Sequence, residues 1–357
     1  MKKMIKKFIR YIKEIRRRII FSFKFTQKIK RLHNRNEKVF VCVDSAVHGN
    51  MGDQALGFCR LKFLQSIGIS KKNIVEYTAR DRMRFWPQIC KVHKESDVFV
   101  LRGGGYWGDL WLDGFEAILD YIKFFPKNPI VVFPQSVYFS NNEKGREVLE
   151  QSKKILDRAS NLIICARDKN SGILLKEYYP KTKVLTMPDT VLSYKPKIKR
   201  RSCESSNKIL LCLRNDKEKS ISIDIEQELR KMVQDTIIFV QDTSIDFNLK
   251  RLYEREKELL KLWETFIQAK LVITDRLHGM IFSAILGIPC IVLNNIDGKV
   301  RHQYEWLKDN VSYVKYVETV TQFQEAYKYI YCCDHMEYPI DNMIPLFNEL
   351  KRCLLNL

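Results

Sequence analysis

Short apolar runs alternate with longer segments of helical periodicity through most of the chain. Continuous runs such as 39–43, 98–101 and 130–133 predict strands that are buried on both faces, and the segments between them have the apolar spacing of helices. The same alternation begins again at 209–213 and continues to 290–293. Strands that alternate with helices predict βαβ units, so we expect an α/β protein with mostly parallel sheets.

A polar, basic stretch without apolar periodicity separates the two series of units. A chain of 357 residues also exceeds the size at which one hydrophobic core keeps growing. We therefore expect two Rossmann-like domains that face each other across a cleft, which is a preferred place for a ligand. The predicted parts are a basic N-terminal segment (1–37), a first domain (38–195), a linker (196–207), a second domain (208–335) and a C-terminal helix that crosses back onto the first domain (336–357).

In the second domain, polar residues lie where a predicted strand, 271–273, meets a predicted helix that ends at Gly287. A helix N-terminus at this edge offers N–H groups to an anion. Arg276 adds a bidentate donor, and His278 adds a proton carrier near neutral pH. A structural interpretation stays open, in which Asp275 caps the helix, Arg276 pairs with a surface acid and His278 is a satisfied loop histidine.

The first predicted strand ends in a glycine-containing loop that leads into a helix. Gly49 and Gly52 permit positive φ, and Asn50 or Asp53 can cap the helix. The loop lacks both GxGxxG and the Walker lysine pattern, so it is no nucleotide fingerprint. A structural turn and a binding role are both compatible with it.

Another predicted strand, 97–101, runs directly into three glycines, 103–105. Such a run is tolerated where a backbone or a ligand approaches closely, and it can form a nest of N–H groups for an anion. The aromatic residues that follow, Tyr106, Trp107 and Trp111, could offer flat faces to sugar rings. The alternative is a tight turn with core aromatics.

Charge is concentrated at the N-terminus: residues 1–35 carry fourteen Lys or Arg and one acid, Glu14, in a chain of net charge +20. This pattern predicts a basic amphipathic helix on an anionic membrane surface, although a helix packed on its own domain is also possible. Nothing in the rest of the chain supports a nucleic-acid arm. The apolar stripe consists of Met4, Phe8, Ile12, Ile15 and Ile19.

The ten cysteines lie in apolar runs or on helical faces, and no CxxC spacing occurs. This usage suggests a reducing cytosol. Residues 332–335 (CCDH) are a conceivable metal cluster, but they lack partner ligands at standard spacing.

Several motifs, in order, resemble those of the polysaccharide pyruvyl transferases. They are GNMGDQA (49–55), LRGGGYWGD (101–109), FPQS (133–136), ARDKNS (166–171), MPD (187–189), LR (213–214), TDRLHGMIFSAILGIP (274–289) and DGK (297–299). The resemblance implies a fold similar to the two-domain, GT-B-like glycosyltransferases. It also implies phosphoenolpyruvate as donor, no tightly bound cofactor, and a sugar acceptor that receives a pyruvyl ketal across two hydroxyls.

The resemblance also implies roles for particular residues. Arg276 and Arg214 would hold the donor's phosphate and carboxylate, His278 would move protons, and Asp53 would orient or deprotonate an acceptor hydroxyl. Lys299 and the N–H groups around Gly279 would add positive charge near the donor. Other residues expected to bind substrate are Asn50, Gly103, Gly104, Gly105, Gln135 and Ser136.

The basic tail would suit a lipid-linked acceptor, with the enzyme in the cytoplasm, peripheral on the inner face of the membrane. The nearest alternative function is a nucleotide-sugar-dependent glycosyltransferase, which typically needs an acidic pair for ribose or an acidic metal-binding motif. No clear one stands out in the sequence.

Overall fold

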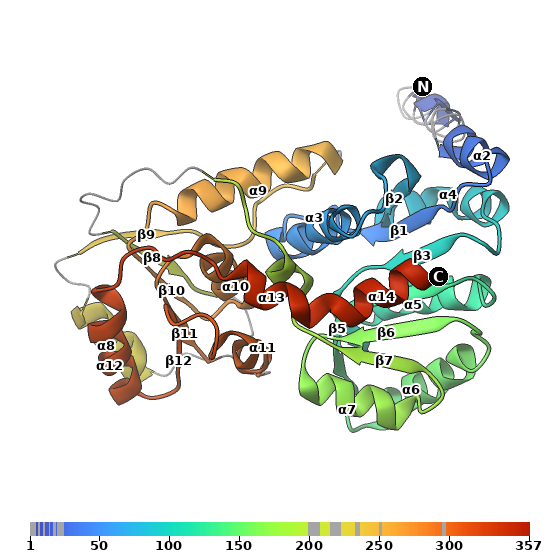
Figure 1. Cartoon of the computed structure of the whole chain (residues 1–357). Coiled ribbons are helices and arrows are strands. Elements are labelled where there is room, and N and C mark those ends of the chain that lie inside the picture. Colours follow the sequence, from blue (N-terminus) through green and yellow to red (C-terminus); the bar gives the residue numbers. More distant parts are fainter. Residues whose placement is uncertain are drawn as a thin grey trace.

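The computed structural model describes residues 25–198, 208–214, 223–232, 236–249, 252–294 and 298–357, together with separate positions between 5 and 19. The chain forms two parallel β sheets, each flanked by helices (Figure 1), which confirms the predicted α/β class with two Rossmann-like units. Among the described residues, no helix is long and apolar enough to cross a membrane. Met4, Asp297 and most of the predicted linker lie outside the described residues.

The first sheet has seven strands in the order β2-β1-β3-β5-β6-β7, with β4 paired to β5. Every pairing is parallel, so all the carboxyl ends meet at one edge. The order reverses direction at β1, which leaves a crevice beyond the ends of β1 and β3. The strands are β1 (Phe40–Ser45), β2 (Ile74–Thr78), β3 (Val98–Leu101), β4 (Gly104–Gly108), β5 (Ile130–Tyr138), β6 (Leu162–Ala166) and β7 (Lys183–Thr186).

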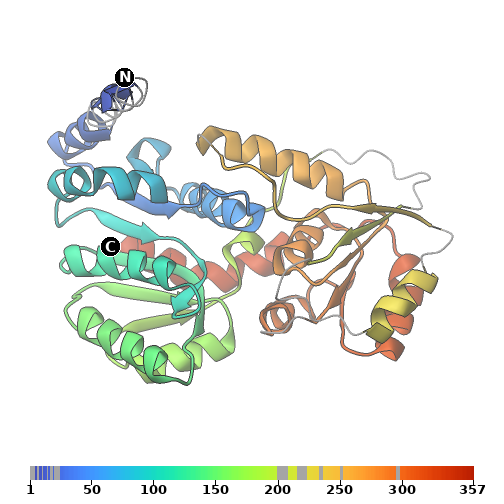
Figure 2. The same cartoon turned by 180° about the vertical axis from the view of Figure 1, so that it is seen from behind.

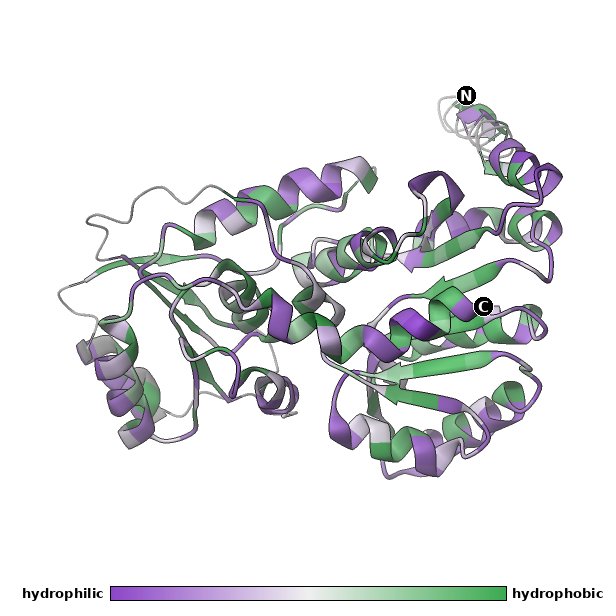
Figure 3. Cartoon of the chain, in the orientation of Figure 1, coloured by the Kyte–Doolittle hydropathy of each residue, from purple (hydrophilic) through white to green (hydrophobic). Residues whose placement is uncertain are grey.

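Both faces of this sheet are buried, because alternate residues of its strands enter two separate cores. Val39, Val41 and Val43 pack under α2 and α4–α7, whereas Phe40 and Cys42 pack under α3 and α14. In Figure 2, the helices that cover Val39, Val41 and Val43 lie in front of the sheet. Figure 3 shows that the strands are the most hydrophobic parts of this half of the molecule. The helices are α2 (Gln27–Asn34), α3 (Met51–Ser66), α4 (Ala79–Val92), α5 (Leu112–Phe124), α6 (Glu143–Leu156), α7 (Lys169–Tyr178) and α14 (Asn348–Asn356), with 3₁₀ turns η2 (Lys71–Asn73) and η3 (Thr190–Ser193).

The second sheet has five parallel strands in the order β12-β11-β10-β8-β9. Its order reverses at β8, so its crevice lies beyond β8 and β10. The strands are β8 (Lys208–Cys212), β9 (Ile237–Val240), β10 (Leu271–Thr274), β11 (Cys290–Leu293) and β12 (Val314–Val317). The helices are α8 (Ile223–Met232), α9 (Leu252–Phe266), α10 (Leu277–Leu286), α11 (Lys299–Leu307) and α12 (Val320–Tyr331).

Helix α3 joins the two halves of the molecule. One side of it packs on the first sheet through Phe63 and Leu64, and the other side packs on α9 and α10 through residues such as Phe58. Beside it, Arg255 of α9 donates two hydrogen bonds to Glu76 of β2, at 2.7 and 3.2 Å. This buried ion pair ties the second half to the first and therefore fixes how the two crevices face each other.

The structure differs from the expected elements in three places. The single C-terminal helix expected from about Asp341 is broken into α13 (Ile340–Met343), η4 (Ile344–Phe347) and α14, since Pro345 supplies no backbone N–H. The expected glycine loop becomes strand β4, in which Gly108 approaches the Tyr138 carbonyl too closely for any Cβ. Trp107 on this strand points inward and is buried, so it offers no face to a sugar.

Candidate active site

A cavity of about 730 Å³ lies where the two crevices meet. In the first half of the molecule, the residues that line it come from segments after β1, β3 and β6, from β4, and from the segment between β4 and the first turn of α5. In the second half they come from the segment after β8 and from the first turns of α10 and α11. Both sheets therefore point their carboxyl ends at one space, as expected for a ligand site in parallel α/β proteins.

His278 lies in the first turn of α10 and lines this cavity. Its Nδ1 lies so close to Gly52 that a Cβ there would approach to 2.2 Å, and its Nε2 lies 3.9 Å from Asp189 Oδ2. Burial lowers the pKa of His278, while the charges of Asp189 and Asp53 oppose that shift. Nε2 has no hydrogen-bond partner among the described residues, so it is available to a ligand.

Arg276 has a different environment, although it precedes His278 by only two positions. Its guanidinium Nη2 donates to Asp242 Oδ2 at 2.5 Å, and the side chain is not among those that line the cavity. The alternative in which Arg276 pairs with a surface acid therefore describes this contact. The role of Arg276 at the donor stays a prediction. Asp275 caps nothing: it is buried, and its Oδ1 accepts the backbone N–H of Arg214 at 2.8 Å.

Among the residues that the structure describes, the positive charge in the cavity comes from Arg102, Arg167, Arg214 and Lys299. Arg167 and Lys299 meet over Gly105, where a Cβ would lie 3.4 Å from Arg167 Nη2 and 3.8 Å from Lys299 Cε. The cationic groups of both halves thus converge on a glycine backbone. Two or more cations around one space are suited to a ligand with several negative charges.

In the first half of the molecule, helix α3 supplies an acid with two polar neighbours, one position after Gly52, which faces the His278 ring. Asp53 Oδ2 accepts a hydrogen bond from Tyr106 OH at 2.9 Å and lies 3.5 Å from His48 Nε2. All three side chains line the cavity. A carboxylate with an adjacent imidazole can accept a proton from a hydroxyl group that enters the cavity.

Several residues predicted to bind substrate make hydrogen bonds within the protein that hold the site together, and their substrate-binding roles stay predictions. Asn50 caps α3 by accepting the N–H groups of Gly52 and Asp53. Gln135 is fully buried; it accepts the Tyr106 N–H and donates to the Arg102 carbonyl at 2.6 Å. Asn50 also lines the cavity, as do Gly104 and Gly105, whereas Gln135 does not.

Ser136, Gly103 and Gly279 also lie outside the cavity lining. Ser136 Oγ accepts a hydrogen bond from Arg167 Nε at 2.7 Å. Gly103 and Gly279 allow close packing, against the Pro134 carbonyl and Thr274 Oγ1 respectively. Gly49 and Gly52 also serve close packing. Neither has positive φ, and each faces an atom of the second half of the molecule.

The sequence analysis did not single out Arg167, Asp189, Arg102 or His48 as site residues. Arg167 and Asp189 form a buried ion pair at 3.4 Å, and Gln303 of α11 bonds the Arg167 carbonyl and the Asp189 N–H. Both follow strands, β6 and β7, so the rule that selected Arg214 could have found them. His48 follows β1 by three positions, as Asp189 follows β7, so the same rule could have found it as well.

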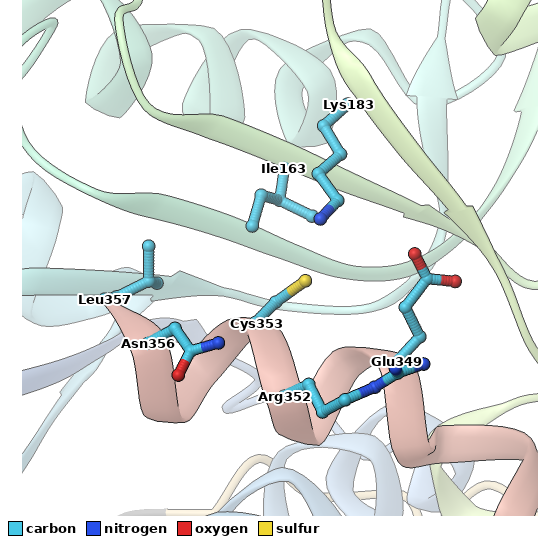
Figure 4. Close-up of a pocket in the computed structure, with 7 residues that line it drawn as sticks. All are labelled: Ile163, Lys183, Glu349, Arg352, Cys353, Asn356 and Leu357. Atoms are coloured by element: carbon cyan, nitrogen blue, oxygen red, sulfur yellow. The ribbon is translucent and has the colours of Figure 1, made fainter.

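Within the described residues, no group of three or more His, Cys, Asp or Glu is arranged to hold a metal ion. His335 of the CCDH stretch contacts the Ala269 carbonyl at 2.8 Å. A second cavity, of about 380 Å³, lies between α14 and the edge of the first sheet (Figure 4). Its lining includes Lys183, Glu349 and Arg352 and none of the residues predicted for the site.

The fold and the cavity define a two-unit α/β enzyme with a cationic site between its sheets. The chain belongs to the polysaccharide pyruvyl transferase family, whose model matches residues 50–298. It is 31% identical to general stress protein 30 of Bacillus subtilis, over 80% of this chain and 82% of that protein. It is 27% identical to pyruvyl transferase 1 of Schizosaccharomyces pombe, over 73% of this chain and 67% of that one.

Among solved structures, an uncharacterised Klebsiella pneumoniae protein, KP1_0663, is similar with a TM-score of 0.56 and 19% identity. The similarity covers 84% of this chain and 99% of that protein. At this identity the comparison supports the fold alone.

Proposed function

We propose that the enzyme transfers the enolpyruvyl-derived group of phosphoenolpyruvate to two hydroxyls of a sugar, forming a pyruvyl ketal. One observation carries the proposal: among the described residues, a half-buried histidine, a carboxylate with its own imidazole neighbour, and four cations line a single cavity. Family membership makes a pyruvyl group the natural one to transfer. No tightly bound cofactor is required, since the donor itself is the activated species.

The donor carries a phosphate and a carboxylate, which need cations on two sides. Arg214 and Lys299 of the second half, with Arg167 of the first, bind these groups in the proposal. Arg276 acts beside them, by holding Asp242 and the start of α10 in place. The negative charges of the donor favour the protonated form of His278, which burial disfavours in the free enzyme.

Ketal formation then needs two proton-transfer groups. His278 gives a proton to the methylene carbon, and the first hydroxyl oxygen bonds to C2 as its own proton passes to Asp53 or His48. The second hydroxyl oxygen next bonds to C2 while the C2–O bond to phosphate breaks, and phosphate leaves with the electron pair and the second proton. A separate acid, His278, and a separate base, Asp53 or His48, suit this addition. One group cannot give and take a proton in the same step.

The test is to incubate the full-length protein with phosphoenolpyruvate and a panel of sugars. We expect phosphate release that requires a sugar and matches pyruvylated product measured by mass. His278→Ala should lower the rate roughly 10²- to 10⁴-fold. Consumption of nucleotide sugars, with no phosphate release from phosphoenolpyruvate, would instead support the glycosyltransferase alternative.

We also propose that residues 1–35 bind an anionic membrane surface on its cytoplasmic side, where a lipid-linked acceptor would be found. Two features support this: the fourteen basic residues of the segment, and the exposure of the apolar side chains described between residues 5 and 19. Those side chains include Ile5, Phe8, Ile12, Ile15 and Ile19.

A further inference from the structure

Arg102 lines the cavity without a carboxylate partner of its own. In the part of the chain that the structure describes, no Asp or Glu lies within ion-pair distance of it, and its buried Nε has no hydrogen-bond partner. Arg167, by contrast, is neutralised by Asp189. A guanidinium that lies in a ligand cavity without a partner is suited to an anion that arrives with the ligand.

The guanidinium is also held in place before any ligand binds. Its central carbon lies 3.7 Å from the centre of the Tyr106 ring, and Gln135 fixes the Arg102 carbonyl. Gly114 leaves space beside it, because a Cβ there would approach Nη2 to 2.7 Å. The Tyr106 ring and the space beside Gly114 hold the planar guanidinium of Arg102 in one orientation. Binding an anion therefore costs little side-chain entropy.

A structural role is the main competitor, because Asp44 is buried nearby. Burial raises the pKa of Asp44, and the charges of Arg102 and Arg82 lower it. Arg82, however, is the residue in direct contact, with its Nε 3.2 Å from Asp44 Oδ1. Asp44 therefore has a cation partner without Arg102.

The position of Arg102 indicates which substrate it contacts. Arg102, Tyr106 and Gly114 form one wall of the cavity on the first sheet, together with Trp111, which is 52% exposed. The cations assigned to the donor lie elsewhere, at Gly105 and at the ends of the second sheet. The exposed face of Trp111 suits a sugar ring, and on the same wall Tyr106 donates its OH to Asp53.

We propose that Arg102 binds an anionic group of the acceptor, a carboxylate or a phosphate carried by the sugar or its immediate neighbour. This inference rests on the proposed function in one respect: that function assigns this wall of the cavity to the sugar acceptor. It predicts that the enzyme favours acidic or phosphorylated glycans over neutral ones of the same sugar.

The test offers each sugar in three forms: the neutral hexose, its 1-phosphate and its uronic acid. We expect the charged forms to have the higher kcat/KM, and the better of the two identifies the source of the anion. In Arg102→Gln, kcat/KM for charged acceptors should fall about 10- to 100-fold, with a much smaller change for neutral acceptors and for the KM of phosphoenolpyruvate. Arg102→Lys should recover part of the loss.

Arg82→Gln is the matched control, because it removes the other cation near Asp44 but lies outside the cavity lining. It should leave the acceptor preference unchanged. Equal rates on neutral and charged sugars, or an effect of Arg102→Gln confined to the donor KM, would overturn the inference.

Calorimetric binding of the same sugars keeps this inference separate from the transfer reaction. Charged sugars that bind in an Arg102-dependent way but never receive a pyruvyl group would support the inference and contradict the proposed function. Failure of every charged sugar to bind more tightly than its neutral form would contradict the inference, whatever the enzyme transfers.

Discussion

His278 lies where burial favours its neutral form, and this has a consequence for stability. Its pKa is lowered from 6.5 in the folded protein, so below about pH 6.5 the unfolded chain takes up a proton that the folded one does not. The free energy of unfolding should therefore fall with decreasing pH, at most about 1.4 kcal/mol per pH unit from this group, until the folded pKa is passed. Urea unfolding of the wild type and His278→Gln from pH 7.5 to 5 measures the difference.

The variant should show a shallower decline than the wild type over that range and the same stability trend above pH 7. Parallel curves for the two proteins would mean that His278 titrates normally.

Gly52 gives a second prediction, because its missing Cβ leaves room for the His278 ring. Gly52→Ala favours helix formation by up to about 1 kcal/mol, but the new Cβ displaces the ring. A side chain can turn away at small cost to the fold, whereas a displaced proton donor costs roughly 10²-fold in rate. We expect a nearly unchanged melting temperature with a large fall in kcat.

Gly57→Ala, further along α3, is the control, since its Cβ would lie 2.9 Å from Arg255 Nη1 and not against His278. It should affect melting more than kcat. The opposite pattern for the two variants would contradict this account of Gly52.

How far the sequence predicts the site depends on the residue. Strand ends located His278 and Arg214 at one edge of the second sheet and Asp53 at the matching edge of the first, because the parallel strands of a sheet end at a common edge. The same rule could not separate Arg276 from His278, since the direction of Arg276 depends on Asp242, 34 positions away. Trp107 and Trp111 likewise look equivalent until strand β4 turns one of them inward.

At the scale of elements, α11 positions the site as well as lining it. Buried Gln303 joins the Arg167 carbonyl to the Asp189 N–H, so one amide orders both partners of the ion pair near His278. Gln303→Leu leaves the Asp189 N–H unpaired, at a cost of about 1–3 kcal/mol, while the Arg167 carbonyl keeps a hydrogen bond from Trp306 Nε1 at 3.0 Å. We expect a lower free energy of unfolding and a lower kcat, measured by denaturant titration and phosphate release.

Arg301→Gln changes an exposed position on the same helix. It should lower neither the free energy of unfolding nor kcat. Wild-type turnover in Gln303→Leu would show that Asp189 keeps its place without the amide.

The elements themselves were predictable where apolar periodicity was strong, as in α6 and α9. Strand β4 was not, because its glycines read as a loop, and only pairing with β5 makes it a strand. The break before α14 was equally hidden, because the apolar spacing continues across Pro345.

At the scale of the whole molecule, the N-terminal segment is expected to direct the enzyme to a membrane. Replacing exposed Ile12 and Ile15 with Asp adds two negative charges to the apolar stripe. Sedimentation with anionic phospholipid vesicles should fall at least about tenfold, because both apolar insertion and charge attraction are weakened. Turnover on a soluble acceptor should be retained.

Met83→Asp is the control, at a Met on α4 that is 80% exposed. Equal vesicle binding by all three proteins would locate the lipid contact outside the apolar stripe.

The return of the C-terminal helix to the first sheet has a consequence for biosynthesis. Phe347, Leu350 and Leu354 complete the core over Phe40 and Val131, yet they follow the entire second sheet in the chain. Until the second sheet has been translated, α3 covers this apolar face of the nascent first sheet without them. That interval is a window for chaperone capture or for aggregation, and a stalled or truncated transcript would extend it indefinitely.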